Sequence, residues 1–462
     1  MRRTLLLLLL LGPLGLAAQD TAIVLTLPRA LGIARANYAG LREKRAYAEA
    51  SARELQADRR DGLPDATLGI EQAFGTLNGL NGLSSGQPGL TTLTNGPVVT
   101  TQNWNAAFGA LYVSNIDWNI YSFGLQRAHV AVGAAQYRQD QEDLRQSVFQ
   151  QEVRVAGAYL SLLAAQRVRM AMEDNLARAL DLREVILART LNGLNPGVDS
   201  SIADAEVSQA RLSLIDAQNY EDVRANELAT GMGVAPQKFA LDTSFSLGLP
   251  PDTLGAVADV SGNPVLQFLS ARIGTSDKLA GYIHKSGLPR ISLFGVGQER
   301  GSGFGSNYSN DPGDVSSDYL QGVNPYRTNY LLGIGLTWNL TGLSRVKART
   351  AAQRFRSEAL ASDYDLAQSK LLNQLALSDR QIGHALARYR ETPVQLRSAS
   401  DAYGQKKALY ENGLNTIVDV TQTLYLLNRA EIDRDIACNA VWQAILFKAG
   451  TAGDLNLFLK QL

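Results

Sequence analysis

Two stretches of similar length run through the chain almost without helix-breaking residues. Residues 125–190 contain no proline and two glycines, and residues 343–410 contain two glycines and a single proline, Pro393. An α-helix rises about 1.5 Å per residue, so each stretch predicts a helix of about 100 Å, longer than an ordinary globular domain holds. We expect Pro393 to kink the second helix without ending it. Apolar residues in the first stretch have the spacing of a coiled-coil seam: Leu144, Val148, Val155, Tyr159 and Leu162.

Several short motifs occur twice, in the same order and at almost the same offset. Trp118-Asn119-Ile120 recurs as Trp338-Asn339-Leu340, and Asn192-Gly193-Leu194-Asn195 recurs as Asn412-Gly413-Leu414-Asn415, both 220 residues later. Leu63-Pro64 recurs as Leu288-Pro289 after 225 residues. We therefore predict two structural repeats, 19–240 and 241–462, each with a helix, two strands, a long helix and a return helix. Because neither repeat is complete alone, the two are expected to form one intertwined unit.

Each predicted repeat contains two segments with the alternation of β-strands. After each Leu-Pro pair come strands at 66–74 and 290–298, then polar, glycine-rich loops at 78–103 and 301–328, then strands at 108–120 and 330–340. About ten residues with one apolar face and aromatic ends are typical of a transmembrane β-strand. Trp118, Tyr330 and Trp338 are the candidate girdle residues at the lipid interface. A soluble, half-buried sheet would show the same alternation.

The N-terminus has the pattern of an export signal. Arg2 and Arg3 precede an apolar run from Leu5 to Leu11, and small residues follow up to Ala18. We predict a cleaved signal peptide over 1–18, since Gly12-Pro13 makes the run too short for a retained anchor helix. A single cysteine suits an exported protein with a bacterial outer-membrane address and a large periplasmic portion.

Composition argues against several function classes. The 44 Lys and Arg balance the 44 Asp and Glu, whereas a nucleic-acid binder would carry a basic excess. Three histidines and one cysteine give no zinc-ligand pattern and no disulfide framework. No nucleophile–histidine–acid set and no phosphate-binding loop is evident, and the glycine-rich 297–303 leads from a strand into a loop. We therefore predict a protein that is not an enzyme and needs no metal or cofactor.

The predicted helices and strands indicate an oligomer. Each long helix ends at an Asn-Gly-Leu-Asn turn, and a return helix follows at 199–230 and at 419–448. These return helices are about half as long, so helices at 28–60 and 263–285 must complete the path back to the strands. Four strands cannot close a membrane barrel, for which eight is the usual minimum, so several chains must share one.

The chain resembles the TolC-like outer-membrane efflux proteins (outer membrane factors) over essentially its whole mature length. The resemblance is carried by the Leu-Pro pairs before a strand, by Trp118 and Trp338, and by a glycine followed six residues later by aspartate at Gly193–Asp199 and Gly413–Asp419. It implies a homotrimer in which four strands per chain form a shared 12-stranded barrel, continued by a long periplasmic helical tunnel.

That resemblance also implies a function without catalysis. Such a duct passes substrates from a periplasmic adaptor (membrane fusion) protein and an inner-membrane transporter to the outside, within a tripartite efflux pump or a type I secretion system. The alternative is a secreted coiled-coil scaffold or adhesin with a soluble β-sheet. Drugs, metal ions, small molecules and polypeptides all remain open as cargo.

The resemblance places functional residues at the helical turns. Tyr410 and Asp419, with Asp199 in the first copy, correspond to an aromatic and an acidic residue of the periplasmic entrance. Asn415 stands where some relatives have arginine, and Gln422 where some have a second acidic residue. An ionic lock of the family type is therefore not expected. Asp419 also suits a plain first-turn helix position. The expected contacts with the adaptor are Gly193, Leu194, Gly413 and Leu414.

Overall fold

A computed structural model describes residues 24–79, 98–243, 248–250 and 259–462. It divides into two compact units. The sheet unit consists of Tyr47–Gln141 and Leu269–Tyr364, and the helical unit consists of Met1–Ala46, Glu142–Phe268 and Asp365–Leu462. The predicted signal peptide at 1–18 lies outside the described residues. Within the described part, every helix is too short or too polar to cross a membrane.

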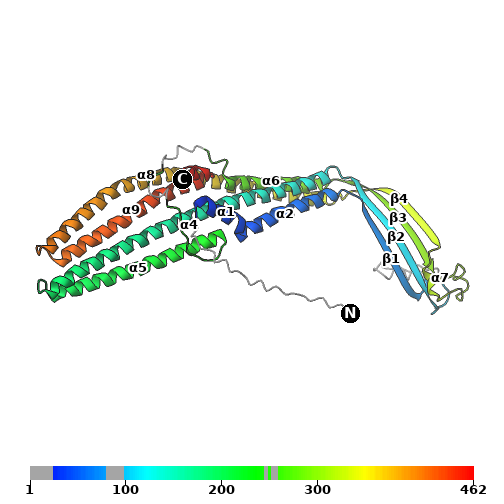
Figure 1. The fold of residues 1–462 in the computed structure, drawn as a ribbon. Coiled ribbons are helices and arrows are strands. Elements are labelled where there is room, and N and C mark those ends of the chain that lie inside the picture. The colour runs from blue at the N-terminus through cyan, green and yellow to red at the C-terminus, as the bar shows by residue number, and fades with distance from the viewer. Residues whose placement is uncertain (1–23, 80–97, 244–247, 251–258) are drawn as a thin grey trace, which may run out of the picture. The chain divides into compact units, whose positions relative to one another are not determined.

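The sheet unit contains one antiparallel sheet of four strands (Figure 1). The strands are β1 (Asp65–Thr76), β2 (Ala106–Tyr121), β3 (Arg290–Ser302) and β4 (Arg327–Thr337), and they pair in chain order. The four strands predicted from alternation are confirmed, although β3 extends beyond the predicted range and β4 begins three residues before it. Because the order is β1-β2-β3-β4, the outer edges of β1 and β4 have no partner strand within this sheet.

The strand register sorts the side chains into two faces of different polarity. Leu68, Ser114, Gly297 and Tyr330 lie in one cross-strand row, with Leu68 87% and Tyr330 84% exposed. Neighbouring rows on that face carry more exposed apolar side chains: Ile70, Ile116, Leu332, Ile334 and Leu336. A row of the opposite face contains Glu71, Leu111, Arg300 and Arg327. The sheet therefore presents one apolar face that the described residues leave uncovered.

Both predicted girdle tryptophans tie a strand to the preceding turn. The indole N–H of Trp118 donates to the Gly62 carbonyl at 3.0 Å, and that of Trp338 donates to the Gly287 carbonyl at 3.0 Å. Trp338 was expected inside a strand running to Leu340, which is wrong, since β4 ends at Thr337.

The predicted exposed loop at 301–328 is wrong in part. β3 takes up its first two residues, and the short helix α7 (Tyr319–Val323) takes up five more. Tyr308 is only 2% exposed, and its hydroxyl donates to the Leu77 carbonyl at 3.1 Å. The polar composition of 301–328 gave no indication that Tyr308 would be buried. Of the other predicted loop, 78–103, residues 80–97 lie outside the described part of the chain.

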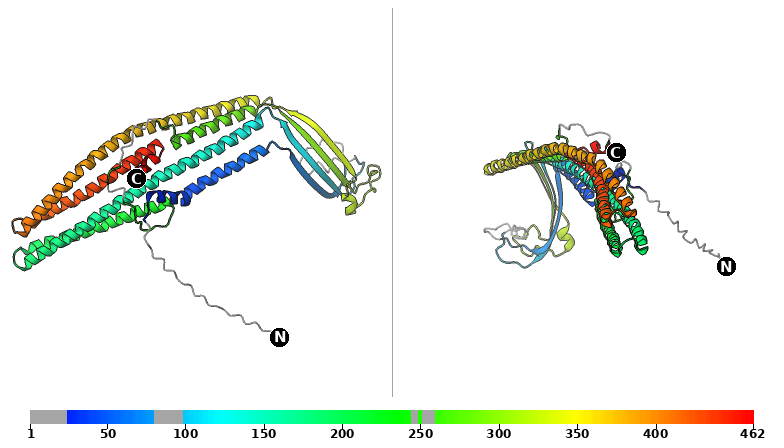
Figure 2. Two further views of the ribbon diagram at one scale, coloured as in Figure 1. Left: turned by 45° about the horizontal axis from the view of Figure 1, so that its top comes forward. Right: turned by 90° about the vertical axis from the view of Figure 1, so that its left-hand side faces the viewer.

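The long helices and their return helices are confirmed. They are α4 (Leu125–Leu191), α5 (Gly197–Met232), α8 (Leu343–Glu411) and α9 (Ile417–Ala452). Within the helical unit, α4 lies beside α5 and α8 beside α9 (Figure 2). Pro393 lies inside the continuous α8. The remaining helices are α1 (Leu27–Asn37), α2 (Ala39–Arg60), α6 (Pro264–Lys285) and α10 (Asn456–Leu459). The single N-terminal helix predicted from Pro28 is thus two helices, because Tyr38 takes an extended backbone conformation.

The core of the helical unit lies where α1, α4 and α9 meet. Tyr159, Trp442 and Phe458 are almost completely buried there. The Tyr159 hydroxyl lies 2.8 Å from the Leu25 carbonyl and 3.1 Å from that of Asp242. Burial raises the pKa of Tyr159 to about 12, so the phenol keeps its proton and remains a donor.

Candidate functional site at the helical turns

The turns after α4 and α8 have the same backbone geometry. Gly193 and Gly413 have φ angles of +73° and +74°, in the left-handed region that favours glycine. The Leu194 N–H donates to the Arg189 carbonyl, and the Leu414 N–H to the Leu409 carbonyl, both at 2.9 Å. With the glycine N–H bonded three residues back, each turn is a Schellman motif. The predicted helix-ending turns are confirmed.

The return helices begin two residues before the aspartates at which they were predicted to start. In α9 the N-cap is Thr416, whose hydroxyl accepts from the Asp419 N–H at 3.4 Å and donates to the Asp419 carboxylate at 3.0 Å. In α5 the N-cap is Pro196, whose side chain has no oxygen to accept a capping hydrogen bond. Asp199 and Asp419 both lie in the first turn, where the helix dipole favours a negative charge.

Asn195 joins the first turn to the second. Its side-chain amide donates to the Tyr410 hydroxyl at 2.6 Å and to the Asp199 carboxylate at 2.8 Å, and its oxygen accepts from Arg189 Nε at 3.0 Å. Both N–H bonds and the oxygen are thus engaged. Arg189 also donates to the Glu411 carbonyl at 2.6 Å, which satisfies an acceptor at the C-terminus of α8.

Tyr410 is the buried centre of this region. It is 2% exposed and packs in a cluster with Leu182, Ile186, Ala203, Ile417 and Val420. The Arg189 guanidinium lies 5.7 Å from the centre of its ring. Burial, and then the negative charge of Asp199, raise the pKa of the Tyr410 phenol. The structure therefore brings Tyr410 and Asp199 together within one chain.

The other predicted entrance residues lie apart from that hub. Asp419 pairs with Lys406 at 3.9 Å, with both side chains about 40% exposed. Gln422 is exposed. The side-chain amide nitrogen of Asn415 is buried and has no hydrogen-bond partner among the described residues, although Asn415 holds the same place in its turn as Asn195. The two turns thus have the same backbone conformation but differ in their side-chain hydrogen bonds.

The turns expose several apolar side chains. Leu194 is 68% exposed and Leu414 is 74% exposed. Further exposed apolar side chains surround them: Leu191, Val198 and Val418. The glycines themselves are exposed, and no atom lies near enough to Gly193 to crowd an added methyl group, so its backbone angle is the reason for glycine there. Two helical ends with projecting leucines form a surface suited to burying another apolar surface.

Arg189, Asn195 and Lys406 were not among the predicted site residues. Asn195 lies in the duplicated Asn-Gly-Leu-Asn motif, which marked it as a turn residue. Its contact with Tyr410 joins residues 215 positions apart, and no local pattern indicates it.

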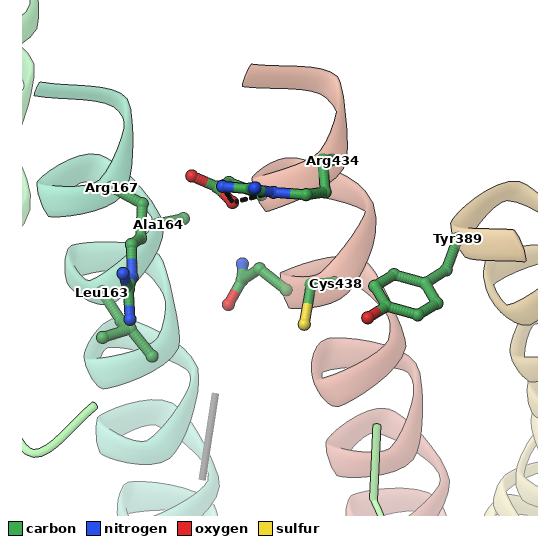
Figure 3. A pocket seen from close by; sticks show the side chains of 8 residues that line it. Leu163, Ala164, Arg167, Tyr389, Arg434 and Cys438 are labelled. Carbon is green, nitrogen blue, oxygen red and sulfur yellow. Dashed lines mark hydrogen bonds and ion pairs between the residues drawn. The ribbon is translucent and has the colours of Figure 1, made fainter. Parts of the chain in front are cut away.

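The helical unit also has a small cleft between α4, α8 and α9 (Figure 3). Its volume is about 230 Å³, and Arg167, Tyr389, Arg434 and Cys438 are among its lining residues. Arg434 is paired with the adjacent Asp435 at 3.0 Å. Cys438 is half-buried, and burial raises the pKa of its thiol.

In the sheet unit, Asp58, Asp61 and His129 come together as potential metal ligands. The low histidine count gave no indication of this group.

Comparison with known proteins finds one family model that matches part of the chain and several solved structures with a similar fold. A model of the outer membrane efflux protein family matches residues 262–437. No curated protein sequence matches the chain.

The fold of the chain is similar to that of solved outer-membrane proteins over nine-tenths of its length. CusC, a protein that forms a transmembrane channel, superposes with a TM-score of 0.76 at 13% identity, covering 93% of this chain and 92% of CusC. The outer membrane protein VceC of Vibrio cholerae gives 0.70 at 16% identity, covering 93% and 96%. The CmeC outer membrane channel of Campylobacter jejuni gives 0.73 at 13% identity, covering 92% and 85%. The resemblance inferred from the sequence motifs is confirmed, since the family model matches part of the chain and the fold is that of solved outer-membrane channels.

Proposed function

We propose that the chain is the outer-membrane export duct of a tripartite efflux pump or a type I secretion system. In this proposal three copies share a 12-stranded barrel, and their helices continue it as a periplasmic tunnel. The efflux protein domain and the channel fold support an outer-membrane efflux channel. The observation that carries the finer proposal is the sheet, with its uncovered apolar face and two unpaired edges.

The unpaired edges favour a shared barrel for an energetic reason. In hydrocarbon, each backbone N–H or C=O without a partner costs several kcal/mol, so an open edge is not tolerated in a bilayer. β1 has 12 residues and β4 has 11, which are lengths that span a bilayer when tilted. Pairing these edges with further copies satisfies both ladders and turns the face of Leu68 and Tyr330 toward lipid.

Membrane fractionation and channel recording test this proposal. The full-length protein, expressed in a Gram-negative host, should fractionate with the outer membrane and migrate as a heat-sensitive trimer. In planar bilayers it should give discrete conductance steps. A monomer that stays soluble without detergent would contradict the proposal and support the secreted scaffold instead.

We further propose that the two turns contact a periplasmic adaptor protein. Leu194 and Leu414 supply exposed apolar side chains, while Gly193 and Gly413 allow the tight backbone that projects them. Leu194→Glu and Leu414→Glu should abolish adaptor co-purification and export while leaving the trimer intact. A matched control is Leu212→Glu, on an exposed position of α5. If the turn variants retain adaptor binding, the adaptor docks elsewhere.

The periplasmic entrance is proposed to lie at the same end of the helical unit. Asp419 is partly exposed beside Lys406, and Gln422 is exposed, so these side chains could face ions in a lumen. Asp419→Ala should change cation block of the conductance, because a ring of three carboxylates attracts cations. Unchanged block across the pH range would leave Asp419 with a helix-capping role alone.

A further inference from the structure

Three potential metal ligands converge at the junction of α2 and α4 in the sheet unit. Asp58 lies in the last turn of α2, Asp61 follows that helix, and His129 lies in the second turn of α4. One ligand atom from each lies within 4.8 Å of the other two. His129 Nε2 is 3.8 Å from Asp58 Oδ1, and His129 Nδ1 is 3.8 Å from Asp61 Oδ2. We propose that this group is a binding site for a first-row divalent transition metal, of which Zn²⁺ is the representative.

The separations fit coordination better than direct contact. A nitrogen and an oxygen 3.8 Å apart are too distant for a hydrogen bond. Ligand atoms about 2.1 Å from one tetrahedral zinc ion lie about 3.4 Å from each other. The two 3.8 Å separations involve different ring nitrogens, and one ion binds through only one of them; the ligand atoms of the three residues lie within 4.8 Å of one another. Two carboxylates beside an imidazole also bring two negative charges together, which a divalent cation neutralises. A single ion would take one imidazole nitrogen and one oxygen of each carboxylate, with water as the fourth ligand, and this requires the side chains to rotate.

Two neighbouring residues of α4, Gly133 and Gln126, affect the position of Asp58. Gly133 lies one helical turn after His129, and a methyl group at that position would overlap the Asp58 carboxylate. Glycine inside a helix costs about 1 kcal/mol relative to alanine, and alanine at this position would require the Asp58 carboxylate to move. The Gln126 side chain also donates to the Asp58 backbone carbonyl at 2.6 Å, which fixes the end of α2 against α4.

The imidazole is held and the site is reachable from solvent. The His129 ring packs against Tyr282 of α6, with ring centres 5.4 Å apart. The Asp61 side chain is 57% exposed and lines a cleft of about 570 Å³ together with Arg53 and Asp65. An ion can therefore reach Asp61 from the cleft and bind a ring that is already oriented.

The ligand set selects the class of metal. Mg²⁺ and Ca²⁺ prefer oxygen ligands alone, whereas an imidazole with two carboxylates suits zinc and its neighbours. The corresponding positions of the second predicted repeat are Ile283, Ser286 and Arg349, which offer no such set. The site thus belongs to the first repeat, and a bound ion would tie α2 to α4 at the base of β1 and β2.

The experiment is a metal titration of the full-length protein in detergent, after removal of metal with a chelator. With ZnCl₂ and a competing chromophoric indicator, we expect one tight site per chain that excess MgCl₂ does not displace. CoCl₂ should give the visible absorption of four-coordinate Co²⁺. His129→Ala and Asp61→Asn should each weaken Zn²⁺ binding at least about tenfold, as should Gly133→Ala, which displaces a ligand without removing one.

His284→Ala is the matched control, since His284 is an exposed histidine near the end of α6. It should leave the Zn²⁺ affinity unchanged. Helix content and oligomer migration of each variant establish that it folds, and Asp61→Asn changes only an exposed side chain. The proposal is overturned if the wild-type protein binds Zn²⁺ no more tightly than His129→Ala, or if His284→Ala weakens binding equally.

Discussion

The hydrogen-bonded hub at Asn195 yields a quantitative prediction about the first turn. Asn195→Ala removes three hydrogen bonds, two of them to the charged groups of Asp199 and Arg189. A neutral hydrogen bond contributes about 1 kcal/mol and one to a charged group about 1.5–3 kcal/mol. Water replaces much of the loss at Asp199 and Arg189, which are partly exposed, but less at Tyr410, which is buried. We expect local opening of the turn to become easier by about 2 kcal/mol.

Hydrogen exchange of the backbone amides measures this change directly. A difference of about 2 kcal/mol corresponds to roughly 30-fold faster exchange through local opening, confined to the end of α4 and the start of α5. Asn415→Ala is the matched control, because Asn415 has the same place in the second turn but its amide nitrogen lacks a partner among the described residues. It should change exchange by less than about threefold. Equal effects of the two substitutions would refute the assigned role of the Asn195 contacts.

A double-mutant cycle isolates the contact that crosses between the turns. Tyr410→Phe removes only the hydroxyl that accepts from Asn195, with an expected cost of about 1 kcal/mol. Because the two side chains touch, the double variant should cost less than the sum of the single variants. Strict additivity would show that the 2.6 Å contact contributes nothing to holding the turns together.

Three further predictions concern single positions. Trp338→Phe loses an indole hydrogen bond and should lower the free energy of unfolding by about 1 kcal/mol in urea titrations, whereas Trp104→Phe, at an 80% exposed position, should have no effect. Gly413→Ala places a methyl group at φ +74° and should destabilise the fold by about 1–2 kcal/mol. Gly383→Ala, inside α8 with open space around it, should stabilise the fold by up to about 1 kcal/mol. Thermal unfolding measures both changes, and the same sign for both would contradict the backbone explanation. Burial, and then the charge of the neighbouring Asp435, raise the pKa of Cys438, so the folded protein has less thiolate at pH 8 than the unfolded protein. Alkylation of Cys438, followed by mass spectrometry, should therefore be slower in the folded state and should accelerate as the pH rises. Equal alkylation rates of folded and unfolded protein at pH 8 would exclude the raised pKa.

The helices were predictable because their signals are local. The absence of proline from 125–190 and the Asn-Gly-Leu-Asn turns located α4 and its end within one residue. Pro393 did not end α8, as expected from the sequence. By contrast, the break at Tyr38 has no proline or glycine at the break itself, so composition gave no warning. Local signals thus determined where the long helices end but not where a buried N-terminal helix bends.

The contacts of the candidate site were less predictable than its backbone. Tyr410, Asp199 and the two glycines were named from the sequence, and the structure places Tyr410 and Asp199 around Asn195. The contributions of Asn195 and Arg189 depend on the packing of α4 against the end of α8. Likewise, Asp58 and His129 are 71 positions apart and meet only because α2 and α4 run side by side. Contacts of this kind depend on how the helices pack, which local sequence patterns and composition do not reveal.

The two unpaired edges of the sheet also restrict the symmetry of any assembly built on them. β1 and β4 run in opposite directions, since four antiparallel strands alternate. Joining β1 to β1 of another copy in antiparallel fashion would relate the two copies by a two-fold axis and point their helices in opposite directions. Copies that all face the same way must instead join β4 to β1 of the next, which is a heterologous contact that closes into a ring. An even number of strands per chain keeps every junction of that ring antiparallel, so subunits can be added without a mismatched seam.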